Sequence, residues 1–144
     1  MVRKILVAYD GSELSKKAIE EAKVQAKLVK DTKIYVVTVV TPGISSNTTA
    51  VAGNLSMKDA EILYPRLENI KEELQASGQV VETEIITDFS QKNPALALCD
   101  FAEENDINMI IVGHRGLSNL QKLFLGSVSG TIVQRAKCQV LIIK

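Results

Sequence analysis

The sequence is poor in the residue types that build metal centres, disulfide scaffolds and histidine-based catalytic sites. Its 144 residues include one histidine, His114, two cysteines, Cys99 and Cys138, and no tryptophan. The cysteines are far apart and form no C-x-x-C pair, so we expect neither a zinc site nor a disulfide framework, and the chain fits a reducing compartment. Because His114 is the only histidine, we expect no histidine-dependent catalytic triad, and we expect His114 to lie exposed in a loop. The sequence therefore predicts no metal-binding residues.

The chain also lacks an excess of charge of either sign. Lysine and arginine total 17, and aspartate and glutamate total 17. Proteins that bind nucleic acid usually carry a basic surplus, so no nucleic-acid partner is expected. No apolar run approaches the roughly 18 residues that a membrane-spanning helix needs, and the first run, residues 5–9, is too short for the core of a signal peptide. We expect a cytoplasmic protein without a membrane partner.

What the chain does contain is an alternation of short apolar runs and helical repeats. Five runs rich in aliphatic and β-branched residues are predicted to be strands: residues 5–9, 33–40, 80–87, 109–112 and 138–143. Four segments between them have helical spacing of apolar residues: residues 12–29, 63–74, 93–104 and 126–136. Residues 41–56 are predicted to form a long surface loop. Pro65 either interrupts the second helix or lies near its start, and the sequence does not decide between these.

This alternation predicts an α/β fold in a single domain that spans residues 1–144. Apolar strands joined by crossover helices are typical of a parallel sheet with helices on both faces and right-handed crossovers. The simplest arrangement is a doubly wound five-stranded sheet with strand order 3-2-1-4-5. No linker, repeat or low-complexity segment divides the chain.

A ligand of such a sheet is expected where the connections after strands 1 and 4 leave toward opposite faces. After the fourth strand come Gly113 and Gly116, which permit positive φ and a close approach of ligand to backbone. Gly126 and Ser127 fall where the last helix should begin, so its N–H groups and its positive dipole end would face the crevice. The hydroxyls of Ser127 and Ser129 add donors. Together these features predict an anion site suited to phosphates.

Asp10 follows the first strand, across the predicted crevice, where its carboxylate could accept hydrogen bonds from ribose hydroxyls. A second interpretation is that Asp10 caps the first helix, a common role for aspartate in a strand-to-helix turn. Gly113 and Gly116 could likewise mark only a turn. Arg115 is either a phosphate contact or a solvated charge.

The residues around this crevice resemble the universal stress protein family. The segment Val7-Ala8-Tyr9-Asp10-Gly11-Ser12 is similar to the family's opening strand and turn. Gly113-x2-Gly116-x9-Gly126-Ser127 is similar to the G-x2-G-x9-G-S/T motif that distinguishes the family's ATP-binding branch. The likeness covers essentially the whole chain.

The resemblance implies that the ligand is ATP, with ADP or AMP as alternatives, and with any Mg²⁺ held mostly by phosphate oxygens and water. It places the ribose at Asp10 and Gly113, and the adenine beside Ala8 and the backbone of Val39. Thr38 departs from the family pattern, in which histidine is frequent at this position. The remaining expected nucleotide contacts are Val112, Arg115, Gly116, Gly126, Ser127 and Val128.

The resemblance also implies a regulator in stress response that acts as a homodimer, paired through the last strand from Val140 to Ile143. The alternative is a slow ATPase or nucleotide-transferring enzyme at the same site. The chain has no GxxxxGK[ST] motif, and Asp10 is the only acid evident in the crevice, so no catalytic residue is predicted. A phosphoacceptor receiver domain would need paired acids after the first strand, and a flavin domain would need an aromatic platform.

Overall fold

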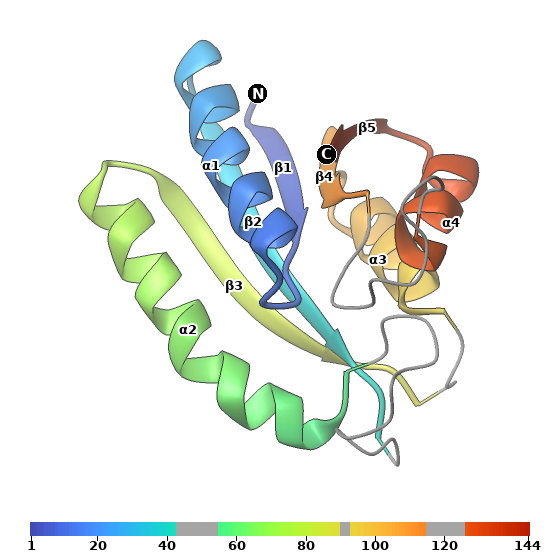
Figure 1. The fold of residues 1–144 in the computed structure, drawn as a ribbon. Helices are drawn as coiled ribbons and strands as arrows, with labels where there is room; N and C mark the ends of the chain where they lie inside the picture. Colours follow the sequence, from blue (N-terminus) through green and yellow to red (C-terminus); the bar gives the residue numbers. More distant parts are fainter. Residues whose placement is uncertain (43–54, 90–92, 115–125) are drawn as a thin grey trace.

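The computed structural model describes residues 1–42, 55–89, 93–114 and 126–144, in which strands and helices alternate (Figure 1). The strands are β1 (Arg3–Ala8), β2 (Thr32–Val40), β3 (Val80–Thr87), β4 (Met109–Gly113) and β5 (Gln139–Ile143). The helices are α1 (Glu13–Leu28), α2 (Met57–Ala76), α3 (Pro94–Glu104) and α4 (Ser127–Arg135).

The five strands form one parallel sheet in the order β3-β2-β1-β4-β5. β1 lies in the centre, with Val7 opposite Val36 of β2 on one side and Ile111 of β4 on the other. The predicted α/β class, the strand order and the single domain are confirmed. The strand bounds differ from the prediction by only a few residues.

Two apolar cores lie on opposite faces of the sheet, because successive residues of a strand point to opposite sides. Ile5 and Val7 of β1 pack with residues of α1 and α2. Leu6, between them, packs instead with residues of α3 and α4. Figure 1 shows α3 and α4 side by side, on the opposite side of the sheet from α2. The predicted helical cover on both faces is confirmed.

Serine hydroxyls cap the first two helices. Ser12 is the N-cap of α1 and accepts a hydrogen bond from the N–H of Ser15 at 3.2 Å. Ser56 and Asp59 form a capping box at the start of α2, in which each side chain accepts from the other residue's backbone N–H. α2 ends before Gly78, whose φ of +85° closes the helix in a conformation that favours glycine.

Pro65 lies inside α2, which runs from Met57 to Ala76 without a break. A proline at this position has no N–H to donate to the carbonyl of Glu61, one turn earlier. Both residues are exposed, so water can bond that carbonyl. The sequence did not decide whether Pro65 interrupts the helix or lies near its start; in the structure it lies in the middle of a continuous helix.

The loop predicted for residues 41–56 lies largely outside the described residues. At its end Leu55 forms an isolated parallel bridge with Val40 and accepts a hydrogen bond from the N–H of Thr41. In the part of the chain that the structure describes, no helix has the length and apolar character needed to cross a membrane.

Candidate functional site

The carboxyl ends of β1 and β4 lie beside each other in the sheet. The chain leaves β1 toward α1 on one face, and α4, which follows β4, covers the other face. Connections that part in this way open a crevice at the carboxyl edge of a doubly wound sheet. The residues that end these two strands and begin α4 are therefore the ones that can meet a ligand there.

Asp10 lies half-buried directly after β1. Its Oδ1 accepts a hydrogen bond from the N–H of Ser12 at 2.9 Å, which orders the turn into α1. Ser12, and not Asp10, is the N-cap of that helix. The Asp10 carboxylate thus has one oxygen engaged by the turn, and its side chain lines a pocket.

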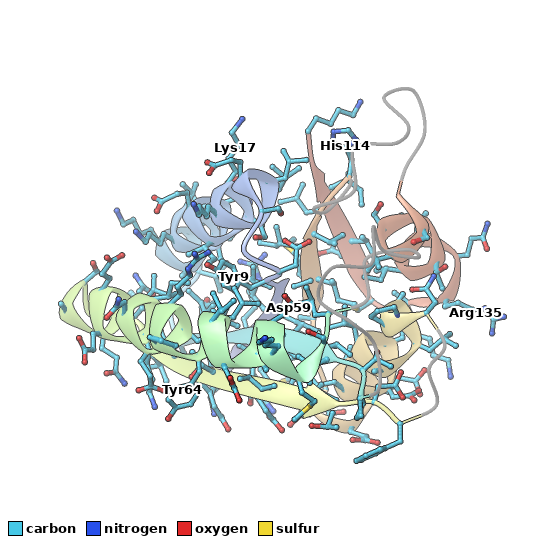
Figure 2. All side chains as sticks on the ribbon, turned by 60° about the horizontal axis from the view of Figure 1, so that its bottom comes forward. Tyr9, Lys17, Asp59, Tyr64, His114 and Arg135 are labelled. Carbon is cyan, nitrogen blue, oxygen red and sulfur yellow. The ribbon has the colours of Figure 1, made fainter. Side chains whose placement is uncertain are left out.

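The carbonyl of His114 fixes the start of α4 to the end of β4. His114 donates its own N–H to the carbonyl of Ile143 in β5 at 2.8 Å. Its carbonyl accepts from the N–H of Gly126 and from the hydroxyl of Ser129 at 2.8 Å. Figure 2 shows the His114 side chain at the surface beside this end of the sheet. The backbone of His114 thereby brings Gly113, before it, close to Gly126.

α4 begins at a glycine, which carries no Cβ. Gly126 is its N-cap, with φ of −62° and ψ of 165°, and among the described residues no side chain caps this end. The amides of a first helical turn have no acceptor within their own helix and carry the positive end of the helix dipole. Ser127 and Val128 supply the next amides, and the Ser127 side chain is exposed.

Two details of the predicted phosphate site need correction. Ser129 was expected to offer its hydroxyl to phosphate, but it is 1% exposed and donates to the His114 carbonyl instead. Gly113 does not use the positive φ that glycine permits; among the described glycines only Gly11 and Gly78 do. The contribution of Ser129 is therefore to hold the loop, and Gly113 ends β4 in extended conformation.

The apolar residues predicted to contact the nucleotide share one core. Ala8, Val39, Val112 and Val128 all belong to, or pack against, the cluster between the sheet and α3 and α4. Val39 is 6% and Val112 5% exposed, so their side chains form a wall below the crevice and not an open pocket. Arg115 and Gly116 lie outside the described residues.

Thr38, where the family pattern often has histidine, joins the ends of two strands. It is fully buried, and its hydroxyl donates to the carbonyl of Tyr9 at 2.8 Å. The N–H of Tyr9 donates to the carbonyl of Val37 at 2.9 Å. The small hydroxyl at this position therefore extends the β1–β2 pairing by one residue, to Tyr9, which directly precedes Asp10.

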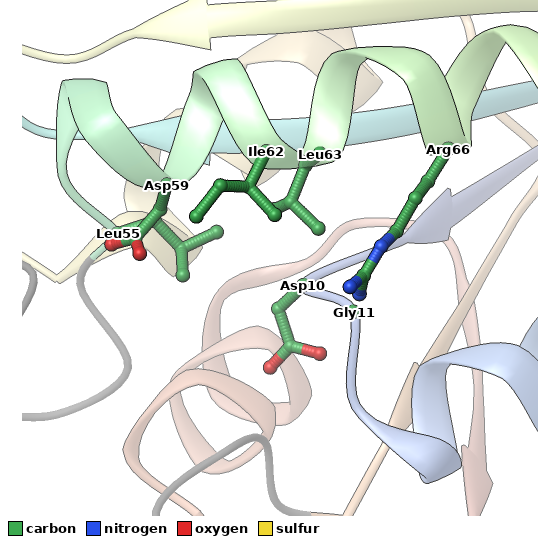
Figure 3. A pocket seen from close by; sticks show the side chains of 7 residues that line it. All are labelled: Asp10, Gly11, Leu55, Asp59, Ile62, Leu63 and Arg66. Carbon is green, nitrogen blue, oxygen red and sulfur yellow. The ribbon is translucent and has the colours of Figure 1, made fainter.

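A pocket of about 130 Å³ opens beside Asp10 on the side of α2 (Figure 3). Figure 3 shows the Arg66 side chain extending from α2 toward the turn at Asp10 and Gly11. The lining combines apolar and charged side chains. The lining residues are Asp10, Gly11, Leu55, Asp59, Ile62, Leu63 and Arg66.

The sequence analysis predicted a helix at residues 63–74 but not its contribution to this pocket. Leu63 is 4% exposed and does belong to the core, but Ile62 beside it is 55% exposed. The signal that could have been used is the S-x-x-D pattern of Ser56 and Asp59, which marks a helix start close to the end of β2. Oδ2 of Asp59 accepts from the N–H and hydroxyl of Ser56 at 2.7 and 2.9 Å.

Neither cysteine is activated for nucleophilic chemistry. Burial raises the pKa of the Cys99 thiol, and the neighbouring Cys138 thiol raises this pKa further. Burial also raises the pKa of Cys138, against backbone hydrogen bonds that act to lower it. Both thiols therefore stay protonated to a higher pH than free cysteine. Within the described ranges no cluster of three or more potential metal ligands occurs.

Comparison with known proteins identifies the class to which this fold and crevice belong. The model of the universal stress protein family matches residues 1–144, and the chain belongs to this family. Universal stress protein YxiE of Bacillus subtilis is 32% identical over 154 residues, an alignment that covers both proteins completely.

Two solved structures are similar over nearly the whole chain. MJ0577, a protein of Methanocaldococcus jannaschii, is 25% identical, with a TM-score of 0.76 and coverage of 100% of this chain and 96% of that one. A universal stress protein in complex with cAMP is also 25% identical, with a TM-score of 0.70 and coverage of 99% and 97%. A structural neighbour of this chain thus binds an adenine nucleotide.

Proposed function

We propose that the chain is an ATP-binding member of the universal stress protein family that acts as a regulator. The nucleotide lies across the carboxyl ends of β1 and β4. The observation that carries this proposal is the start of α4, tied to β4 through the His114 carbonyl and placed at the same edge of the sheet as Asp10. A similar family member binds cAMP, which supports an adenine nucleotide as the ligand.

The phosphates meet the first turn of α4. Gly126 has no Cβ to block their approach, and the amides of Ser127 and Val128 and the Ser127 hydroxyl supply donors at the positive end of the helix dipole. Gly116 and Arg115 contribute from the segment between β4 and α4. Mg²⁺, where present, is held mainly by phosphate oxygens and water.

The nucleoside meets the end of β1. Oδ1 of Asp10 is engaged by the turn, and Oδ2 remains for a ribose hydroxyl. Gly113 lets the sugar approach the backbone of β4. Ala8 and Val112 form the wall beneath the nucleoside, and the backbone of Val39 bonds the edge of the base. ADP and AMP share these contacts and compete with ATP.

The same site could run a slow ATPase or nucleotide-transfer reaction. Efficient phosphoryl transfer needs a positioned base and a lysine or carboxylate that holds the metal at the phosphates. Among the described residues Asp10 is the acid at the crevice, the Asp59 carboxylate of the adjoining pocket is engaged by Ser56 in the capping box of α2, and no described lysine lines that pocket. A regulator is therefore favoured, and a turnover assay separates the two functions, because an enzyme should exceed about 0.01 s⁻¹.

We place the regulator in the cytoplasm as a homodimer. β5 ends the sheet, and its residues Val140 to Ile143 are only half-buried. An open apolar edge strand is normally covered or paired, and a second copy related by a two-fold axis would pair it.

Calorimetry with ATP tests the proposal. The wild-type protein should bind ATP with a dissociation constant of about 10 μM or tighter, and Gly126→Val should abolish binding while the fold persists. Valine accepts the extended φ and ψ of Gly126 without backbone strain, and its branched side chain would stand in the approach to the amides; circular dichroism checks that the fold persists. Gly78→Ala, at the far end of α2, is the control and should bind normally. No saturation of the wild type at millimolar ATP, or normal binding by Gly126→Val, would contradict the proposal.

A further inference from the structure

The side chain of Asn93 joins the starts of α3 and α4. Asn93 is the N-cap of α3, and its Oδ1 accepts from the N–H of Ala95 at 2.9 Å. Its Nδ2 turns the other way and donates to the carbonyl of Ser127 and to the hydroxyl of Thr131, both at 2.9 Å. The Asn93 side chain thus caps α3 and donates two hydrogen bonds to the first and second turns of α4. We call these two hydrogen bonds the grip.

The grip matters because few residues of α4 are buried. The helix has nine residues, and only Ser129 and Ile132 are buried. Ser129 is held through its hydroxyl by the His114 carbonyl, on the side of β4. Asn93 holds the neighbouring Ser127 from the side of α3. These two polar attachments fix both the position of the first turn and its rotation about the helix axis.

We infer that Asn93 is a positioning residue, which orients the first turn of α4 so that its amides converge on the phosphates of the nucleotide. The inference rests on the proposed function, and it names a residue that the glycine motif does not contain. Asn93 acts through Ser127 and does not touch the ligand. Its effect should therefore fall on the phosphates and leave the nucleoside end of the site unchanged.

The cap and the grip can be separated by substitution. Serine is about as good an N-cap as asparagine, but it is too short to reach α4 and has no amide donor. Asn93→Ser therefore keeps the start of α3 and removes both hydrogen bonds to α4. Thr131→Val removes one of the two acceptors and keeps the shape of the side chain.

The test compares ATP with adenosine, which has no phosphates, by competition against a fluorescent ATP analogue. Asn93→Ser should weaken ATP binding about 5- to 10-fold and change adenosine binding by less than about 2-fold. Thr131→Val should weaken ATP binding about 2- to 3-fold. The double variant should bind ATP no more weakly than Asn93→Ser, since both changes remove the same contact.

Three results would overturn the inference. Equal losses for ATP and adenosine would show that Asn93 only maintains the fold, and unchanged ATP binding by Asn93→Ser would show that the grip does not orient the amides. If the wild-type protein binds no ATP, the proposed function fails and the role of Asn93 falls with it. The wild-type titration distinguishes that failure from the first two.

Discussion

Gly11 sits in the turn between β1 and α1 with φ of +84°, a conformation that residues with a Cβ rarely adopt. It is also crowded. A Cβ at this position would lie 2.9 Å from Cδ2 of Leu63 and 3.5 Å from Nη1 of Arg66, both from α2. Gly11 therefore lets the turn that carries Asp10 pass close under α2.

Gly11→Ala should lower the free energy of unfolding by about 2–3 kcal/mol, from backbone strain together with the clash against Leu63. Gly78 is the matched control, because its φ of +85° is almost the same and a Cβ there would meet nothing within 4 Å. Gly78→Ala should cost about 1 kcal/mol, from strain alone. Urea denaturation measures both, and equal losses would contradict the role of Leu63.

At the scale of residues, the sequence placed site residues most reliably where they lie directly at the end or the start of a predicted strand or helix. Asp10 and Gly126 could be placed because each follows or precedes a well-marked element. The role of Ser129 could not, since its bond to the His114 carbonyl joins residues that are 15 positions apart. Arg66 was missed for the same reason: its approach to Gly11 depends on how α2 packs over the turn.

α2 illustrates what the sequence leaves undecided at the scale of elements. Its start could have been read from Ser56 and Asp59, but Ile62 and Tyr64 are both more than half exposed and blur the helical pattern. Figure 2 shows Tyr64 on the outer side of the helix. In the sequence, Pro65 therefore resembles the end or start of a helix. In the structure α2 continues on both sides of Pro65, because Leu63 and Leu67 both pack in the core beneath it.

Pro65→Ala should raise the free energy of unfolding by about 1–3 kcal/mol. Alanine restores the N–H for the Glu61 carbonyl and removes the interior proline penalty, less a small gain in the entropy of the unfolded chain. Glu72→Ala, at another exposed position of α2, is the control and should change stability by less than about 0.5 kcal/mol. A loss of stability in Pro65→Ala, measured by urea denaturation, would show that α2 is built around the proline.

At the scale of the whole molecule, the sequence was sufficient for the topology. Five strands separated by four helices, with right-handed crossovers and both faces covered, leave few arrangements, and the observed order β3-β2-β1-β4-β5 is the simplest. The switch point between β1 and β4 follows from that order. The sequence could not give the depth of the pocket beside Asp10, because this depends on the packing of α2 against the turn.

The exposed edge of β5 gives a prediction for the assembly. Ile143 directs its carbonyl toward His114, so Val140, an odd number of residues away, directs its N–H to the open edge. Val140→Pro removes that donor without removing a bond to β4, and proline is tolerated on such edges. It should convert the proposed dimer into a folded monomer, whereas Val140→Ala should remain dimeric. Analytical ultracentrifugation measures both, and a dimer of unchanged strength in Val140→Pro would show that β5 is not the interface.

The most direct test of the central claim is a titration of ¹⁵N-labelled protein with ATP, followed by the backbone amide resonances. Phosphates held at the start of α4 should shift the amides of Gly126, Ser127 and Val128 most strongly, together with those around Asp10. Adenosine should shift the region of Asp10 and leave the start of α4 nearly unchanged. Saturable shifts at another surface, with the amides of residues 126–128 unaffected by ATP, would contradict the account.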